Sequence, residues 1–284
     1  MSLPVALWLG ACALWGSGPS EPEQRATEHG SYWVHRPAPD AHRVLVAVHG
    51  MVGEEGAEAE AARQLLEQWT PFAQAHGLVV VAPVFDDVHF ASRTPGALGG
   101  YRSLVGRVVA ADAFLHEVLA DVAAHEQVPT ERFLLFGHSA GGQFANRYLV
   151  THPGRVAAAV ISAPAWFAFP DPDTRWPHGM APRRSVFSWG EHGDEVRVDV
   201  TPRPQAWRDA AAVPTLVVVG EQDRAPLREG SPLDHVTQAR AWVEAMGALG
   251  PAGPAGPELL VVPDVGHNQG KLLRAAQPWL AERR

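Results

Sequence analysis

The chain has 284 residues, of which 46% are hydrophobic and 19% charged, and its formal net charge is -8 at pH 7. This is the composition of a globular protein, and the length suits one large α/β domain. The acidic balance argues against nucleic-acid binding, which needs a basic patch or stripe.

The first 29 residues have features of an export signal. An apolar run over residues 5–15 has the length of a signal-peptide core and is too short to span a bilayer. Ala11-Cys12-Ala13 fits a small-x-small cleavage pattern, and residues 9–12 are similar to the lipobox of bacterial lipoproteins, whose cysteine carries a lipid. Cys12 is the chain's single cysteine, so no intrachain disulfide can form.

We therefore expect residues 1–29 to be an export segment and linker, with the main domain at residues 30–284. The protein would be secreted, periplasmic or anchored to a membrane through lipidated Cys12. The first four residues contain no Lys or Arg, which favours the alternative of a cytoplasmic protein with a short apolar extension.

Downstream, strand-like and helix-like segments alternate. Continuous apolar runs predict strands buried on both faces of a sheet, at residues 43–50, 78–84, 132–137, 156–164, 214–223 and 258–267. Helical patterns lie between and after them, at residues 55–77, 112–126, 141–154, 233–249 and 270–282. The alternation predicts an α/β fold with right-handed crossovers and a doubly wound, mostly parallel sheet.

One segment interrupts the alternation. Residues 165–213 are rich in Pro, Trp and Arg and show no regular period. An irregular insertion of that length is typical of a lid or a binding loop, so we expect one there.

The clearest chemical motif lies between the strand at 132–137 and the helix at 141–154. Gly137-His138-Ser139-Ala140-Gly141 matches the pattern G-x-S-x-G. In that pattern the serine sits on a sharp strand-to-helix turn, where its neighbours must lack bulk and its hydroxyl projects at a helix N-terminus. The alternative is a plain glycine turn with an incidental serine. The functional interpretation needs an acid and then a histidine later in the chain.

Both partners occur in the required order. The strand at 214–223 ends in Glu221-Gln222-Asp223, and the strand at 258–267 runs into Gly266-His267. A serine hydroxyl needs a base to take its proton, and a carboxylate orients the imidazole that does so. We predict Ser139 as nucleophile, His267 as base and Asp223 as acid, with Glu221 as the alternative acid. His235 also follows the serine, but it falls within a predicted helix.

Acyl transfer also needs hydrogen-bond donors for the developing oxyanion. The backbone N–H of Ala140, next to the serine, is one expected donor. The other is expected in the loop after the strand at 43–50, from Met51 or, as the alternative, Val52. Gly50, after His49, would remove side-chain bulk at the start of that loop. The alternative is that the glycine only terminates the strand.

The stretches VAVHGM, FGHSAGG, VVVGEQD and DVGHNQG together resemble the α/β-hydrolase-fold serine esterases, from about residue 43 to the C-terminus. HSAGGQFANRYLVTHPGRVAAAVISAPAW is similar, more weakly, to the polyhydroxybutyrate-depolymerase and feruloyl-esterase-like branch, many of whose members are secreted. The resemblance implies the α/β-hydrolase fold and triad roles for Ser139, Asp223 and His267. The chain differs from that branch in having no disulfide pairs and a long Trp- and Pro-rich insertion.

The insertion would lie over the carboxyl edge of the sheet, where ligands bind in such folds. Its aromatic side chains either wall an apolar pocket or form a small core of their own. As pocket residues the sequence offers His138, Trp166, Trp176 and Trp189.

The leading hypothesis is a serine hydrolase that cleaves a small-molecule or polymer carboxylic ester through a covalent acyl-enzyme. We expect no cofactor and no metal, because the histidines are scattered along the sequence and no H-E-x-x-H or cysteine cluster occurs. The alternatives are a peptidase or thioesterase on the same fold, and a catalytically silent exported binding module.

Overall fold

The computed structural model describes residues 21–92, 100–189, 194–224, 234–250 and 256–283. Its centre is an eight-stranded sheet with the order β1-β2-β4-β3-β5-β6-β9-β10. The two strands β1 and β2 pair antiparallel with their neighbours, and every other pairing in the sheet is parallel. The strands are β1 (Glu23–Ala26), β2 (Ser31–His35), β3 (Arg43–Val48), β4 (Leu78–Pro83), β5 (Phe133–His138), β6 (Val156–Ser162), β9 (Thr215–Gly220) and β10 (Glu258–Val262).

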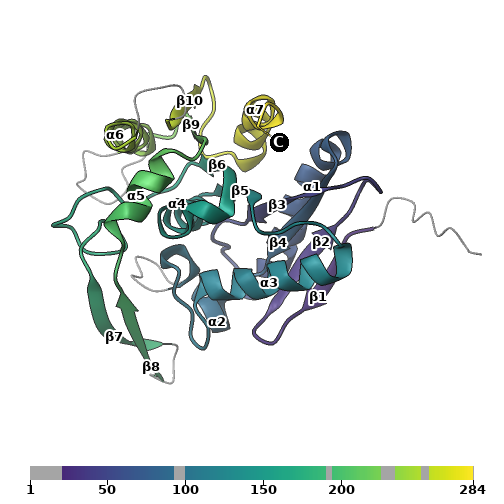
Figure 1. Ribbon diagram of the computed structural model, residues 1–284, viewed down its shortest axis with the longest axis horizontal. Helices are drawn as coiled ribbons and strands as arrows, with labels where there is room; N and C mark the ends of the chain where they lie inside the picture. Colours follow the sequence, from purple (N-terminus) through teal and green to yellow (C-terminus); the bar gives the residue numbers. More distant parts are fainter. Residues whose placement is uncertain (1–20, 93–99, 190–193, 225–233, 251–255, 284) are drawn as a thin grey trace, which may run out of the picture.

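Helices cover both faces of the sheet (Figure 1). On one face, α1 (Glu58–His76) and α7 (Gln269–Ala281) pack over a core that includes Leu45 and Ala47 of β3. On the other, α3 (Ala111–Glu126), α4 (Ala140–Thr151), α5 (Pro204–Ala211) and α6 (His235–Gly247) pack over a core that includes Val44, Val46 and Val48. Successive side chains of a strand point to opposite faces, so one apolar run serves two cores. The predicted doubly wound sheet is confirmed.

All six predicted strands are present, but two further strands precede them. The strands β1 and β2 form an antiparallel pair at the edge of the sheet, with Glu23 opposite Val34. The β1 sequence, EQRA, is polar and mostly exposed, so it carries no apolar signal. The sheet therefore begins at Glu23, upstream of Gly30, where the sequence predicts the domain to start.

The insertion at residues 165–213 is not irregular throughout. It contains an antiparallel hairpin of β7 (Arg183–Trp189) and β8 (Asp194–Val200), followed by α5. Figure 1 shows this hairpin projecting away from the central sheet. The expectation of an irregular segment was wrong for this part, because alternating polar and apolar residues in a two-stranded ribbon resemble loop composition.

Three short helical turns complete the described elements: α2 (Asp87–Phe90), η1 (Tyr101–Ser103) and η2 (Pro153–Arg155). Within the described ranges, no helix is both long and apolar enough to cross a membrane. The predicted export segment and Cys12 lie outside the described residues, apart from the stretch that contains β1.

Parallel strands β3, β5, β6, β9 and β10 end at the same edge of the sheet. The segments that follow four of them contain His49, Ser139, Asp223 and His267. This edge is where ligands bind in open α/β sheets.

Candidate active site

Ser139 occupies the turn between β5 and α4. Its backbone has φ 56° and ψ -115°, a conformation that L-residues rarely adopt. The turn is fixed on one side by the Ser139 N–H, which donates to the carbonyl of Ser162 at 2.8 Å. A strained residue held in place by its surroundings is typical of a functional position.

The glycines around Ser139 are required by close backbone packing. A Cβ added to Gly137 would lie 2.0 Å from the carbonyl oxygen of Gly141, and one on Gly141 would lie 2.2 Å from that of Val48. At Gly142 the Cβ would lie 2.7 Å from the oxygen of Ser162. The glycine pattern of the sequence therefore reflects the tight crossing of β5, α4 and the neighbouring strands.

Asp223 and His267 come together at the ends of β9 and β10. The His267 Nδ1 and the Asp223 Oδ2 are 2.7 Å apart, in hydrogen-bond geometry. Asp223 is buried, with 5% of its surface exposed. The alternative acid, Glu221, is exposed and its Oε2 instead accepts from the Asp264 N–H at 3.3 Å. Asp223 is thus the carboxylate that faces the histidine.

The loops that carry Asp223 and His267 are tied to each other by their backbones. The Glu221 N–H donates to the carbonyl of Val262 at 2.9 Å, and the Gln222 N–H donates to that of Val265 at 2.8 Å. These bonds extend the β9–β10 pairing beyond the sheet and fix the two side chains relative to each other.

The His267 loop also lies beside the serine turn. The ring of His138, the residue before Ser139, is 4.8 Å from the ring of His267, centroid to centroid. The Nδ1 of His138 is engaged with the hydroxyl of Ser162, at 3.0 Å. Burial, and then the nearby charge of His267, lower the pKa of His138 to about 3, so it is a neutral ring at pH 7.

His235 is a third histidine at this position. It is the first residue of α6, whose N-cap is Asp234. Its Nδ1 lies 3.2 Å from the Asp223 Oδ1, and its ring centroid lies 5.1 Å from that of His267. The Nδ1 is out of line for a hydrogen bond and has no hydrogen-bond partner among the described residues.

The sequence predicts a helix over residues 233–249, which would place His235 inside it. In the structure α6 begins at His235, and the first residue of a helix turns its side chain toward the preceding loop. Asp234, a preferred N-cap residue, is the signal that marks this start.

The ionised form of Asp223 is favoured despite its burial. Burial alone would raise its pKa, but the contacts with the rings of His235 and His267 outweigh that effect and hold the pKa below the usual range. Asp223 is therefore a carboxylate at neutral pH, as an orienting acid must be.

The loop after β3 passes directly beside the serine. A Cβ on Gly50 would lie 3.4 Å from the Cβ of Ser139. Met51, which follows, lines the same cavity as Ser139 and Ala140. This places the segment of the predicted oxyanion donor next to the predicted nucleophile.

His49 holds that loop in place, a role that its position in the sequence does not indicate. Its Nε2 accepts from the Phe85 N–H at 3.1 Å, so the proton is on Nδ1, which lies 2.7 Å from the Gly50 carbonyl oxygen. The Tyr101 hydroxyl donates to the His49 carbonyl at 3.2 Å. Because burial lowers its pKa, His49 is a neutral structural ring.

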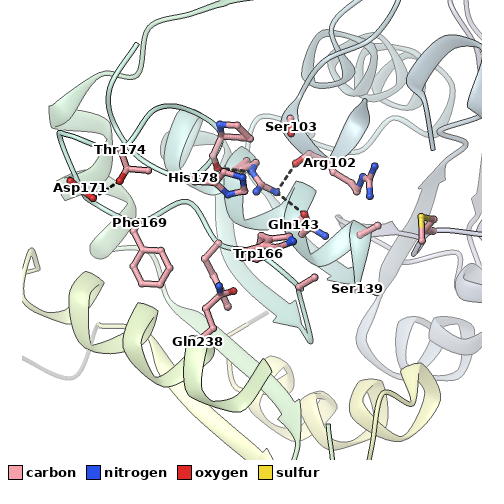
Figure 2. A pocket seen from close by; sticks show the side chains of 16 residues that line it. Arg102, Ser103, Ser139, Gln143, Trp166, Phe169, Asp171, Thr174, His178 and Gln238 are labelled. Atoms are coloured by element: carbon pink, nitrogen blue, oxygen red, sulfur yellow. Dashed lines mark hydrogen bonds between the residues drawn. The ribbon is translucent and has the colours of Figure 1, made fainter. Parts of the chain in front are cut away.

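A cavity of about 700 Å³ opens beside Ser139 (Figure 2). The aromatic lining comes from the insertion, and α4 contributes Ala140, Gln143 and Arg147. The aromatic side chains are those of Trp166, Phe167, Phe169 and His178, and the polar ones include Gln143, Asp171, Thr174 and Gln238. The cavity could hold a substrate with both apolar and hydrogen-bonding groups.

The four residues predicted to line the pocket occupy different places in the structure. Trp166 lines the cavity. Trp176 does not, because it is buried in the main core and its indole N–H donates to the Ser103 carbonyl at 3.2 Å. His138 lies behind Ser139, bonded to Ser162. The side chain of Trp189 lies outside the described residues. The aromatic side chains of the insertion thus serve both as cavity wall and as core.

Arg147 of α4 lines the cavity and hydrogen-bonds to two segments around it. Its Nε donates to the Pro177 carbonyl at 2.9 Å, and its Nη1 donates to the Arg102 carbonyl at 2.9 Å. Figure 2 shows these bonds and the one to Gln143 as dashed lines. Burial, and then the charge of Arg102, lower the pKa of Arg147 to about 9. Arg147 thus joins the insertion and η1 to α4.

One group of side chains in the described part of the chain is close enough to hold a metal ion. It consists of Asp223, His235 and His267, whose ligand atoms all lie within 4.8 Å of one another. Histidines that are scattered along the sequence are therefore close together in space.

Comparisons with known proteins identify the fold. A family model described as the alpha/beta hydrolase fold matches residues 91–194. Among curated proteins, none matches the chain significantly.

Solved structures match over nearly the whole chain. LpqC, a poly(3-hydroxybutyrate) depolymerase from Bordetella parapertussis, is 24% identical, with a TM-score of 0.67 over 89% of this chain and 84% of its own. Poly(aspartic acid) hydrolase-1 from Sphingomonas sp. KT-1 is 17% identical, with a TM-score of 0.68 over 92% and 98%. An S-formylglutathione hydrolase from Agrobacterium tumefaciens is 17% identical, with a TM-score of 0.56 over 92% and 94%.

Proposed function

We propose that this chain, which has the α/β-hydrolase fold, is a serine hydrolase that cleaves carboxylic esters through a covalent acyl-enzyme. The observation that carries the proposal is Ser139 on a strained strand-to-helix turn, beside the hydrogen-bonded pair of His267 and Asp223. The likeness of the fold to esterases and other hydrolases supports it.

In this mechanism the Nδ1–H of His267 donates to the Asp223 carboxylate, which leaves Nε2 free to act as base. As Ser139 Oγ attacks the carbonyl carbon, Nε2 takes the hydroxyl proton and a tetrahedral intermediate forms. The backbone N–H groups of Ala140 and Met51 donate to its oxyanion. His267 then gives the proton to the leaving alcohol as the C–O bond breaks. Water repeats these steps on the acyl-enzyme, releases the acid and restores Ser139.

The side chains that line the cavity indicate which class of substrate it could hold. Its aromatic wall suits an apolar or ring-shaped group, and its glutamine, threonine and aspartate side chains suit hydroxyl or amide groups. Small esters and the ends of polyester chains both meet this description. Poly(aspartic acid) hydrolase-1 and the S-formylglutathione hydrolase have similar folds, so amide and thioester substrates are the second candidates.

The proposal includes export. The N-terminal segment before β1, with its apolar run at residues 5–15, would direct secretion, and a lipid on Cys12 would retain the protein at a membrane. Replacing Cys12 by Ala would then move the protein from the membrane fraction to the soluble fraction, while an unchanged distribution would contradict lipid anchoring.

Hydrolysis of short p-nitrophenyl esters tests the activity. The Ser139→Ala variant should lose activity and keep its circular-dichroism spectrum, because the substitution removes one oxygen from a partly exposed side chain. Activity retained in this variant would contradict the assignment. A matched panel of ester, thioester and anilide substrates would separate the esterase from the thioesterase and peptidase alternatives.

A further inference from the structure

We propose that Asp223, His235 and His267 form a binding site for a divalent transition-metal ion of the zinc class, and that the bound ion inhibits the enzyme. The inhibitory effect rests on the proposed function. The binding itself does not, since it depends only on the three side chains.

The side chains already have nearly the spacing that such an ion needs. His235 Nδ1 lies 3.2 Å from the Asp223 Oδ1, and His267 Nδ1 lies 2.7 Å from Oδ2. A tetrahedral zinc ion with bonds of about 2.0–2.2 Å holds its ligand atoms roughly 3.3–3.5 Å apart. Binding therefore requires the His267 ring to move away from the carboxylate by roughly 0.6–0.8 Å and the His235 ring by roughly 0.1–0.3 Å.

His235 supplies the independent reason to expect a ligand here. The side chain of His235 is 12% exposed, and its buried Nδ1 contacts only the Asp223 Oδ1 among the described residues, at 3.2 Å and out of line for a hydrogen bond. A buried polar atom without a well-aligned partner is costly, and native structures rarely keep one without a reason. A metal ion between this nitrogen and the Asp223 carboxylate would satisfy it.

Among the described residues, the neighbouring polar groups leave three protein ligands for the site. The Nδ1 of His138 is engaged with the Ser162 hydroxyl, and Glu221 is exposed and accepts from the Asp264 N–H. Two histidines and one carboxylate, with water in the fourth position, make a donor set that zinc accepts.

Inhibition follows from the tautomer of His267. In the proposed mechanism Nδ1 carries the ring proton and Nε2 is the base. A metal bound at Nδ1 forces the neutral ring to carry its proton on Nε2, so the ring has no free base to offer Ser139. The same ion would also neutralise the charge of Asp223. The ion would thus block catalysis without touching the cavity.

Zinc binding is tested first without reference to activity. All proteins carry Cys12→Ser, which removes the chain's single thiol, and Ser139→Ala. Calorimetric titration with Zn²⁺ should show one site, and Co²⁺ should give the visible absorption of a tetrahedral complex. His235→Gln should weaken the Zn²⁺ affinity at least ~10-fold. The matched control is His29→Gln, which alters another histidine–carboxylate pair, with Glu117 at 2.8 Å, and should leave the affinity unchanged.

Inhibition is tested in the same proteins with Ser139 restored, each compared with its own rate without zinc. The parent and His29→Gln should be inhibited reversibly, with EDTA restoring activity, and His235→Gln should need at least ~10-fold more zinc. Equal affinity of His235→Gln and the parent, or zinc bound without inhibition, would overturn the proposal. A parent protein that is inactive on every acyl substrate would contradict the proposed function, and the calorimetry would still decide whether the site exists.

Discussion

Asp223 is contacted by two imidazole rings, and only one of them is in line for a hydrogen bond. His267 Nδ1 lies 2.7 Å from Oδ2, whereas His235 Nδ1 lies 3.2 Å from Oδ1 and out of line. The bond to His267 selects the tautomer in which Nε2 is unprotonated. At the scale of single residues, this bond is what distinguishes a candidate base from a surface histidine.

Replacing Asp223 by Asn tests that interpretation. The amide cannot accept the Nδ1 proton in the same way and favours the wrong tautomer, so kcat should fall roughly 10³–10⁴-fold with little change in KM. The control is Glu221→Gln, which removes the neighbouring carboxylate from an exposed position and should keep kcat within about twofold. Steady-state kinetics on a p-nitrophenyl ester measure both. If Glu221→Gln were the variant that lost activity, the acid would be misassigned.

Much of the candidate site could be predicted from the sequence because its residues lie in short motifs next to predicted strands. The G-x-S-x-G pattern and the order of the serine, acid and histidine depend on short motifs at strand ends, and the structure places Ser139, Asp223 and His267 after β5, β9 and β10. His49 and His235 could not be assigned in that way. Their positions depend on contacts with Phe85 and Asp223, which are 36 and 12 residues away from them along the chain.

At the scale of elements, the insertion is joined to α4 by buried polar groups. The Asn146 Oδ1 of α4 accepts from the Ala168 N–H at 2.7 Å, and the Trp242 indole N–H of α6 donates to the Ala168 carbonyl at 2.8 Å. Arg147 adds its bond to Pro177. These contacts fix the aromatic wall of the cavity relative to Ser139.

The Asn146→Ala variant should therefore be less stable and bind substrate less well. Asn146 is fully buried, and its loss leaves the Ala168 N–H without an acceptor, at a cost of about 1–3 kcal/mol. Urea unfolding measures the change, and KM should rise more than kcat falls. The exposed Gln205→Ala change on α5 serves as control and should stay within about 0.5 kcal/mol of the parent. An unchanged unfolding midpoint for Asn146→Ala would show that this anchor is dispensable.

The elements that escaped sequence prediction share a physical cause. Parallel strands buried on both faces are continuous apolar runs, such as LVVVAP in β4. The strand β1 lies at an edge and needs no apolar residues, and the β7–β8 hairpin is held mainly by pairing between its own two strands. Backbone pairing leaves little trace in composition.

At the scale of the whole molecule, the sheet begins with strands that precede the predicted domain start. Arg25 of β1 reaches across to α3 and donates to Glu126 at 2.7 Å, while both side chains are largely buried. The strand β1 also covers the outer edge of β2, which would otherwise expose unpaired backbone groups.

A chain that starts at Gly30 should accordingly be less stable than one that starts at Glu21. The shorter chain lacks β1 and the Arg25–Glu126 pair, and we expect a loss of roughly 2 kcal/mol, or about 4–8 °C in Tm. Thermal unfolding of the two purified proteins measures the difference. Equal melting temperatures would mean that the domain is complete from Gly30 onward, as the sequence alone predicts.

The central claim is that Ser139 is an activated nucleophile, and covalent labelling tests it most directly. A fluorophosphonate probe should add to the intact protein once, peptide mapping should place the adduct on Ser139, and Ser139→Ala should remain unlabelled. His267→Ala should label far more slowly, because the serine would lose its base. No adduct on the folded parent protein, or an adduct on another residue, would contradict the account.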